Sequence, residues 1–168
     1  MIEIKLRPQR VSDAKRFFEI LNNDNFLYFP VRPSSVEDEK KFLMMNPTKR
    51  KNNFEYNYTI SFDNIIVGAI GIKINQHVTY IGEIGYFIDE CYWNRGIASK
   101  AVLLLEKSGF FDLKLERIEI IMATDNIGSI SVAEKCNYHK EGLLKNRINI
   151  FGKFYNALLY AKTKDELM

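Results

Sequence analysis

The chain has 168 residues, 46% of them hydrophobic, and a formal net charge of +3 with both signs scattered along its length. That length supports one sizeable hydrophobic core and is short for two ordinary domains, so residues 1–168 are expected to form a single domain. Because the sequence has no basic stripe, acidic tail or apolar run of about 20 residues, it argues against a protein that binds nucleic acid or spans a membrane.

The chain begins with the pattern of a strand and then of a helix. Ile2 to Arg7 alternates apolar and charged side chains, which predicts a strand and not the apolar core of a signal peptide. Ser12 is placed to cap a first helix, whose apolar side chains recur on one face until Asn22–Asn25 ends it.

A second helix is predicted after a proline-containing loop. Ser34-Ser35-Val36-Glu37 has the spacing of a capping box, and the helix should run to about Met45, where Asn46-Pro47 closes it. The short basic run Lys49-Arg50-Lys51 then falls in a loop, where we expect it to face water.

Three strands follow in a meander. Tyr56–Phe62 and Ile65–Ile74 are rich in β-branched and aromatic residues, and Asp63-Asn64 between them predicts an antiparallel hairpin with a tight turn. Thr79–Ile88 continues the meander as the third strand.

The third strand runs into a tight turn, Trp93 to Ser99, which opens a helix that ends near Phe111. Gly96 and Ala98 are small, so a bulky anion could approach the helix N-terminus, where backbone N–H groups lack intrahelical partners. Those donors and the helix dipole suit a diphosphate, and Arg95 would add a charged contact. Gly96 and Ala98 could equally do no more than allow a tight connection between strand and helix.

The last third of the sequence completes a mixed sheet. Arg117–Ala123 is predicted as a strand and Ile127–Cys136 as a short helix. A final strand pair, Tyr138–Ile150 and Phe154–Lys162, should turn at Gly152. This order of elements predicts an α+β fold, with helices on both faces of a mixed sheet.

The cysteines and histidines indicate neither a disulfide framework nor a metal site. Cys91 and Cys136 are the only cysteines, which suits reduced thiols in a cytoplasmic protein. His77 and His139 lie too far apart in sequence for a recognisable metal-ligand spacing.

The strand, turn and helix around Gly96 resemble those of a known enzyme family. Neither the P-loop pattern G-x-x-x-x-G-K-[ST] nor the dinucleotide pattern G-x-G-x-x-G occurs in the chain. The coenzyme A turn of the GNAT N-acetyltransferase superfamily, [QR]-x-x-G-x-[GA], is matched over Trp93–Ala98, except that Trp93 replaces Gln or Arg. The string EIGYFIDECYWNRGIASKA resembles the subgroup of ribosomal-protein N-terminal acetyltransferases and spermidine acetyltransferases, where an aromatic residue is common at that position.

A second block carries the same resemblance. LERIEIIMATDNIGSISVAEKCNY is similar to the subgroup's strand, N-x-x-S turn and helix, although Asn137-Tyr138 stands where Gly-Phe is usual. Asn can take the left-handed conformation that ends a helix, so the turn is kept. With the C-terminal stretch, the resemblance covers roughly residues 79–164, about half of the chain.

The resemblance implies a GNAT-type fold in which two parallel strands, here Thr79–Ile88 and Arg117–Ala123, splay apart and admit the pantetheine of acetyl-CoA. Backbone groups near Phe87 and Ile88 would bind the pantetheine amides, and a strand N–H in the same region would polarise the thioester carbonyl. Acetyl-CoA is then a co-substrate, and no metal is expected. The diphosphate would bind the turn residues Arg95, Gly96, Ile97, Ala98 and Ser99.

The resemblance also implies the catalytic groups. Ser129 matches the subgroup's serine that hydrogen-bonds the leaving sulfur, and Asn126 would hold pantetheine through its amide, although Asn and Ser also commonly begin helices. Ala133 occupies the position of the tyrosine general acid of many GNAT proteins. Glu83 is the candidate base, since its carboxylate could face the acceptor pocket, although it could also be an ordinary exposed strand carboxylate.

The implied activity is acetyl transfer from acetyl-CoA to a primary amine, either a protein N-terminal α-amine or a small-molecule amine. At pH 7 a lysine amine costs about 4–5 kcal/mol to deprotonate and an α-amine only about 1 kcal/mol, which favours an α-amine or an amino sugar. Six aromatic residues are available to wall an acceptor pocket, although most are expected in the core: Phe26, Tyr28, Phe29, Tyr86, Phe151 and Tyr155.

Two other interpretations stay open. The chain could be a non-catalytic acetyl-CoA-binding module that acts as a sensor or interaction protein, which Ala133 would favour, or an unrelated α+β nucleotide-binding domain. Coenzyme binding without transfer to any amine would indicate the former, and binding of ATP or NAD without acetyl-CoA the latter. As an enzyme, the chain is expected to act as a monomer or homodimer.

Overall fold

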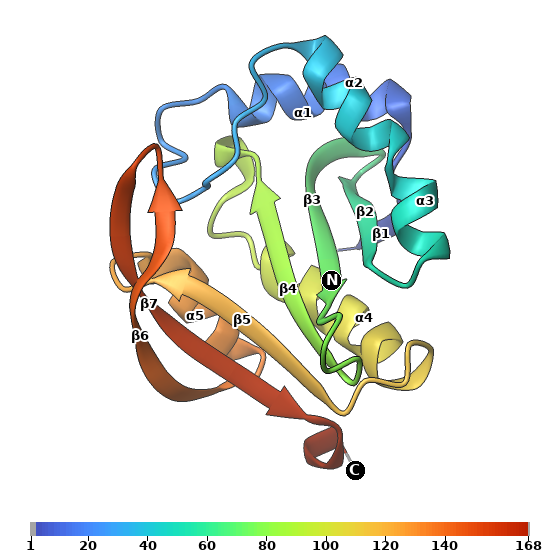
Figure 1. Ribbon diagram of the computed structural model, residues 1–168. Helices are drawn as coiled ribbons and strands as arrows, with labels where there is room; N and C mark the ends of the chain where they lie inside the picture. Colours follow the sequence, from blue (N-terminus) through green and yellow to red (C-terminus); the bar gives the residue numbers. More distant parts are fainter. Residues whose placement is uncertain (1–2, 168) are drawn as a thin grey trace.

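A mixed seven-stranded sheet runs through residues 3–167, which are the residues that the computed structural model describes (Figure 1). The strands lie in the order β1-β2-β3-β4-β5-β7-β6. β4 and β5 pair in parallel, and the other neighbouring strands pair in antiparallel fashion. The strand bounds are β1 (Ile4–Pro8), β2 (Glu55–Phe62), β3 (Ile65–Ile74), β4 (Ile81–Ile88), β5 (Arg117–Ala123), β6 (His139–Ile150) and β7 (Lys153–Thr163).

Helices cover both faces of the sheet, which confirms the predicted α+β fold. They are α1 (Ala14–Leu21), α2 (Val36–Met44), α3 (Asn46–Lys51), α4 (Ile97–Phe111) and α5 (Ile127–Lys135). Ile72 of β3 belongs to the main core cluster together with Leu105 of α4 and Ala133 of α5. Ala69 of the same strand points to the opposite face and packs with Phe17 of α1. The α1–α2 pair and the α4–α5 pair therefore lie on opposite sides of the sheet.

The predicted strands are confirmed to within two residues at each described end. β3 and β5 have the predicted bounds, and β4 begins at Ile81 where Thr79 was expected. The predicted start of the first strand at Ile2 lies outside the described residues. Gly152, with a φ of 87°, turns the final hairpin as predicted.

The predicted cap of the first helix is wrong. Ser12 lies inside a short 3-10 turn, Val11–Asp13, and in the described part of the chain no side chain caps α1. Asp13 is instead buried and joins two strands to the helix start. Its carboxylate accepts hydrogen bonds from the two terminal guanidinium nitrogens of Arg7, at 2.7 and 2.8 Å, and from the hydroxyl of Thr59 at 2.7 Å.

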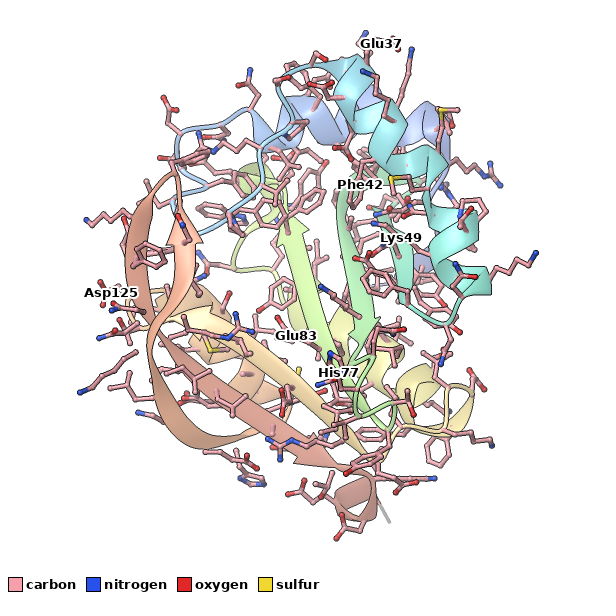
Figure 2. The ribbon with its side chains drawn as sticks, in the orientation of Figure 1. Glu37, Phe42, Lys49, His77, Glu83 and Asp125 are labelled. Atoms are coloured by element: carbon pink, nitrogen blue, oxygen red, sulfur yellow. The ribbon has the colours of Figure 1, made fainter. Side chains whose placement is uncertain are left out.

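The predicted loop after Met45 is also wrong, because Asn46-Pro47 begins helix α3 where it was expected to close α2. Proline fits the first turn of a helix, where its missing N–H has no intrahelical acceptor in any case. The basic run is therefore helical. Lys49 pairs with Glu55 at 2.8 Å, and its amine lies 3.9 Å from the ring centre of Phe42, so this side chain packs against its neighbours and does not simply face water (Figure 2).

The parallel pair β4–β5 separates along its length, as the family resemblance implies. Register pairing joins Ile81–Glu83 to Arg117–Glu119 and extends no further between the two strands. Beyond that point β4 continues along β3 as far as Ile88, whereas β5 stays with β7 as far as Ala123 (Figure 1). The facing edges of β4 and β5 are therefore left without a strand partner.

Candidate functional site

A cavity of about 790 Å³ lies where β4 and β5 part. The cavity is walled by the C-terminal part of β4, the turn into α4, the end of β5 and one side of α5. The loop after α1 and the bulged part of β6 complete the wall. The structure brings all ten predicted site residues to this one cavity: Glu83, Phe87, Ile88, Arg95, Gly96, Ile97, Ala98, Ser99, Asn126 and Ser129.

The turn before α4 has the features of an anion cradle. Gly96 is the N-cap of α4 and has a φ of 74°, a left-handed conformation that favours glycine. A Cβ built there would meet nothing within 4 Å, so the space above the helix end is open. Within the described residues no side chain caps α4, and the first-turn residues Ile97, Ala98 and Ser99 line the cavity. This geometry fits a diphosphate at the helix N-terminus.

Trp93, the residue that departs from the family motif, ties this turn to two other elements. Its indole N–H donates a hydrogen bond of 2.7 Å to the carbonyl of Ile88. Its ring meets that of Phe26 edge-on, with centroids 5.7 Å apart. The Ile88 carbonyl is one of the backbone groups expected to bind pantetheine, and Trp93 already uses one of its two lone pairs.

Asn126 and Ser129 lie at the start of α5. The side-chain oxygen of Asn126 accepts a 3.1 Å hydrogen bond from the backbone N–H of Ser129. Asn126 therefore caps α5, which is the common role of Asn at the start of a helix. That bond uses the carbonyl and leaves the amide nitrogen of Asn126 to donate. Ala133 is fully buried in the main core cluster and does not line the cavity, so position 133 offers no acid to the reaction.

Tyr86 is a functional candidate that the sequence analysis treated only as a pocket wall. The residue lines the cavity, yet its hydroxyl oxygen is enclosed and has no hydrogen-bond partner of ordinary geometry among residues 3–167. Burial raises the pKa of Tyr86 to about 12, and the nearby hydroxyl of Ser129 acts against that rise. The sequence could have indicated this position. Alternate residues of a strand share a face, so Tyr86 lies on the same face of β4 as Ile84 and Ile88, toward α4 and α5.

Glu83 lies on the other face of β4, at the last residue paired with β5 (Figure 2). Its carboxylate is half-exposed and lies 3.9 Å from the guanidinium of Arg147. Burial raises the pKa of Glu83, Arg147 lowers it, and the neighbouring carboxylate of Glu119 raises it. The candidate base and the Tyr86–Ser129 pair therefore approach the strand opening from opposite faces of β4.

A bulge in β6 places Arg147 in the site. The pairing of β6 with β7 shifts between Leu144 and Ile148, and Asn146 takes a φ of 51°. The side chain of Asn156 on β7 accepts the Asn146 N–H at 3.0 Å and thereby holds the bulge. Arg147 lines the cavity as a result, which sequence reasoning missed because a bulge is set by cross-strand contacts.

Of the six aromatic residues expected near the acceptor, Phe26, Tyr28, Phe29 and Tyr86 line the cavity. Phe26 and Phe29 also belong to a small core cluster, so the same rings serve as core and as wall. Phe151 lies outside the lining, at the tip of the last hairpin, where the guanidinium of Arg32 sits 5.7 Å from its ring centre.

Two general properties complete the description. Among residues 3–167, no three His, Cys, Asp or Glu side chains gather in a way that could hold a metal ion. No helix in that range is long and apolar enough to cross a membrane.

Comparisons with known proteins agree with the site's geometry. The sequence profile described as the acetyltransferase (GNAT) domain matches residues 3–139. The chain is 30% identical over 158 residues to the probable N-acetyltransferase YjcK of Bacillus subtilis, a match that covers 89% of this chain and 87% of that protein. It is 27% identical to the ribosomal-protein-serine acetyltransferase of Escherichia coli, over 83% of this chain and 78% of that one.

A solved structure has the same fold. Mycobacterium smegmatis RimJ in complex with CoA-disulfide superposes with a TM-score of 0.89 at 24% sequence identity, over 98% of this chain and 83% of that one.

Proposed function

The chain belongs to the GNAT acetyltransferase family and is an N-acetyltransferase, and we propose that it moves the acetyl group of acetyl-CoA to the α-amine of a protein or peptide N-terminus. The observation that carries this proposal is the cavity between the parted strands β4 and β5, which joins the cradle at Gly96 to Ser129 and Glu83.

Acetyl-CoA fits the cavity by the chemistry of its walls. The cradle residues Arg95–Ser99 would hold the diphosphate, and the Asn126 amide would hold the pantetheine near its end. The unpaired edge of β4 at Tyr86 and Ile88 would bind the pantetheine amides, because the carbonyl of Phe87 between them points toward Gly68 of β3. Bound there, the coenzyme supplies an acetyl thioester. Ser129 would donate a hydrogen bond to the sulfur, and Glu83 would take a proton from the attacking amine.

Charge favours an α-amine over a polyamine as acceptor. The cavity is lined by one acidic side chain, Glu83, and by the basic side chains of Arg95, Lys135 and Arg147. A polycation would have to bring several positive charges past Arg147 toward a single carboxylate, at a Coulomb cost. The acceptor-side loop, residues 25–30, carries no charged side chain, which suits an extended peptide. The likeness to a ribosomal-protein-serine acetyltransferase supports this choice.

We also propose that residues 1–168 work as a single domain in the cytoplasm. Cys91 and Cys136 are both free thiols, which is consistent with a reducing compartment. A non-catalytic module is the second candidate, and the buried Ala133 favours it because the family's usual acid is missing.

A thiol-release assay tests the proposed function. With acetyl-CoA and a panel of N-terminal peptides, polyamines and amino sugars, we expect the peptides to give the highest kcat/KM. Preference for polyamines would overturn the acceptor, and coenzyme binding without release on any amine would favour the non-catalytic module.

Gly96→Glu tests the cradle separately. The new carboxylate would occupy the anion site and repel the diphosphate, so coenzyme A binding measured by calorimetry should be lost. Gly152→Glu is the matched control, because Gly152 also has a positive φ, of 87°, and open space around its Cβ, but lies outside the cavity lining. Normal coenzyme affinity in the Gly96 variant would remove the proposed cradle.

A further inference from the structure

We infer that Tyr86 is a positioning residue of the transfer reaction: once coenzyme A is bound, its hydroxyl donates a hydrogen bond to the Ser129 hydroxyl and so turns the Ser129 proton toward the leaving sulfur. The inference rests on the proposed function for its chemistry, and it assigns a role to a residue that neither the coenzyme motif nor the expected acid at position 133 accounts for.

The geometry of Tyr86 requires an explanation. Its hydroxyl oxygen is enclosed and lacks a hydrogen-bond partner of ordinary geometry in the described chain. A buried hydroxyl left without a partner costs about 1–3 kcal/mol, so phenylalanine would serve better if the ring only filled the core. Tyr86 and Ser129 line the same cavity, and the Ser129 hydroxyl lies close enough to the Tyr86 hydroxyl to lower the pKa of Tyr86.

Ser129 is held for this role by its neighbours. Its backbone N–H is fixed by the Asn126 cap at 3.1 Å, which places the residue in the first turn of α5. A serine hydroxyl rotates freely, and its proton takes the direction that its acceptors and donors impose. A hydrogen bond received from Tyr86 occupies one lone pair of the Ser129 oxygen, which directs the Ser129 proton away from Tyr86 and toward the cavity.

Whether Tyr86 donates a hydrogen bond or gives up its proton depends on the pKa of its hydroxyl. Burial raises the pKa of Tyr86 to about 12, so the phenol stays protonated and acts as a donor throughout the reaction. The amine nitrogen attacks the thioester carbon, the carbon–nitrogen bond forms, and the carbon–sulfur bond breaks with its electron pair going to sulfur. The surplus proton leaves the amine through Glu83 to water, and water later protonates the released thiolate. Tyr86 and Ser129 lose no proton and stabilise the charge that grows on sulfur.

Tyr86→Phe tests the inference with little change in packing. Loss of one indirect hydrogen bond should lower kcat about tenfold, while KM for acetyl-CoA and the affinity for coenzyme A change less than about twofold. The Tm of the coenzyme-free protein should not fall, because in that state the removed hydroxyl has no hydrogen bond of ordinary geometry to lose. In the Ser129→Ala background the same change should have no further effect on kcat, because Tyr86 acts through Ser129.

Tyr138→Phe is the matched control. The Tyr138 hydroxyl is also buried without a partner of ordinary geometry in the described residues, but it lies outside the cavity lining. Its removal should leave kcat unchanged. An unchanged kcat in Tyr86→Phe, or a tenfold loss that persists in the Ser129→Ala background, would overturn the inference.

A second measurement separates this inference from the proposed function. The thiol of bound coenzyme A can be titrated by its thiolate absorbance without any acceptor amine. Tyr86→Phe should raise that thiol's pKa, and Tyr138→Phe should leave it unchanged. If no amine is acetylated but Tyr86→Phe still raises the pKa of the bound thiol, the proposed function fails and the positioning role holds. If Tyr86→Phe leaves the pKa of the thiol unchanged, the positioning role is overturned.

Discussion

Individual residues set the electrostatics of the strand opening. Glu83 carries the acceptor-side carboxylate, and its pKa is raised first by burial and then by the like charge of Glu119, against the lowering effects of Arg147 and Lys73. A raised pKa makes a carboxylate a better proton acceptor, but it also narrows the pH range over which the group is ionised. The usefulness of Glu83 as a base is therefore greatest between its own pKa and that of the amine.

Glu83→Gln should consequently slow the enzyme most in the mildly acidic range. For an α-amine acceptor with a pKa near about 7.8, the amine is already neutral above about pH 8.5, so Glu83 no longer has to remove the ammonium proton and takes only the proton released on attack. As the pH falls below that value, the wild type should increasingly outpace the variant, until the pH reaches the raised pKa of Glu83 and the carboxylate itself is protonated. The ratio of the two kcat/KM profiles measures this directly, and a ratio that is flat with pH would exclude Glu83 as the base.

Glu119→Gln tests whether the acidic limb of the pH profile belongs to Glu83. Because the Glu119 carboxylate raises the pKa of Glu83, removing its charge should lower that pKa and move the acidic limb of the wild-type profile to lower pH. A shift in the opposite direction would show that the limb belongs to another group.

At the scale of helices and strands, the sequence predicts what local chemistry decides and misses what distant partners decide. The bounds of β3 and β5 follow from runs of β-branched residues, and the cradle follows from Gly96 in its turn. The local sequence around Pro47 predicts a helix end, yet Pro47 lies in the first turn of α3. The start of α3 is held by distant residues, because the Asn46 side chain makes hydrogen bonds to Gln9 at 2.7 Å and to Asn57 at 3.1 Å. The β6 bulge depends on Asn156 in the next strand, and the enclosed hydroxyl of Tyr86 depends on α5.

One pair of elements, α4 and β7, is joined by a buried ion pair that the sequence did not suggest. The amine of Lys162 lies 2.9 Å from the Glu106 carboxylate and 2.9 Å from the carbonyl of Cys136, and both charged side chains are only 5% exposed. A pair of this kind is weak evidence for added stability, but removing one partner leaves the other charge buried alone.

Lys162→Met should therefore lower the free energy of unfolding by about 3–5 kcal/mol, as measured by denaturant titration. The double variant Glu106→Leu with Lys162→Met should recover most of that loss, because neither charge is then buried without a partner. A double variant as unstable as Lys162→Met alone would show that packing, and not the stranded carboxylate, causes the loss.

Over the whole molecule, the acceptor-side loop and the cradle are connected through the segment between β4 and α4. The side chains of Asn23 and Asn25 each donate a 2.7 Å hydrogen bond to the carboxylate of Glu90, and these bonds lower its pKa. The Phe26–Trp93 ring contact makes a second link between the same two segments. The loop at residues 25–30 lines the acceptor end of the cavity, and the segment that contains Glu90 and Trp93 leads into the turn that would bind the diphosphate.

Glu90→Ala should loosen the acceptor-side loop without disturbing the cradle, because Gly96 and the start of α4 lie beyond the lost hydrogen bonds. We expect the KM for the peptide acceptor to rise about threefold to tenfold, the range of one or two exposed hydrogen bonds, with coenzyme A affinity unchanged. Glu37→Ala is a suitable control, since Glu37 is an exposed acid on α2 that pairs with Lys40, three residues along the same helix. If Glu90→Ala weakens coenzyme binding as much as acceptor binding, the two ends of the cavity are coupled through Glu90 and the loop is not an independent acceptor wall.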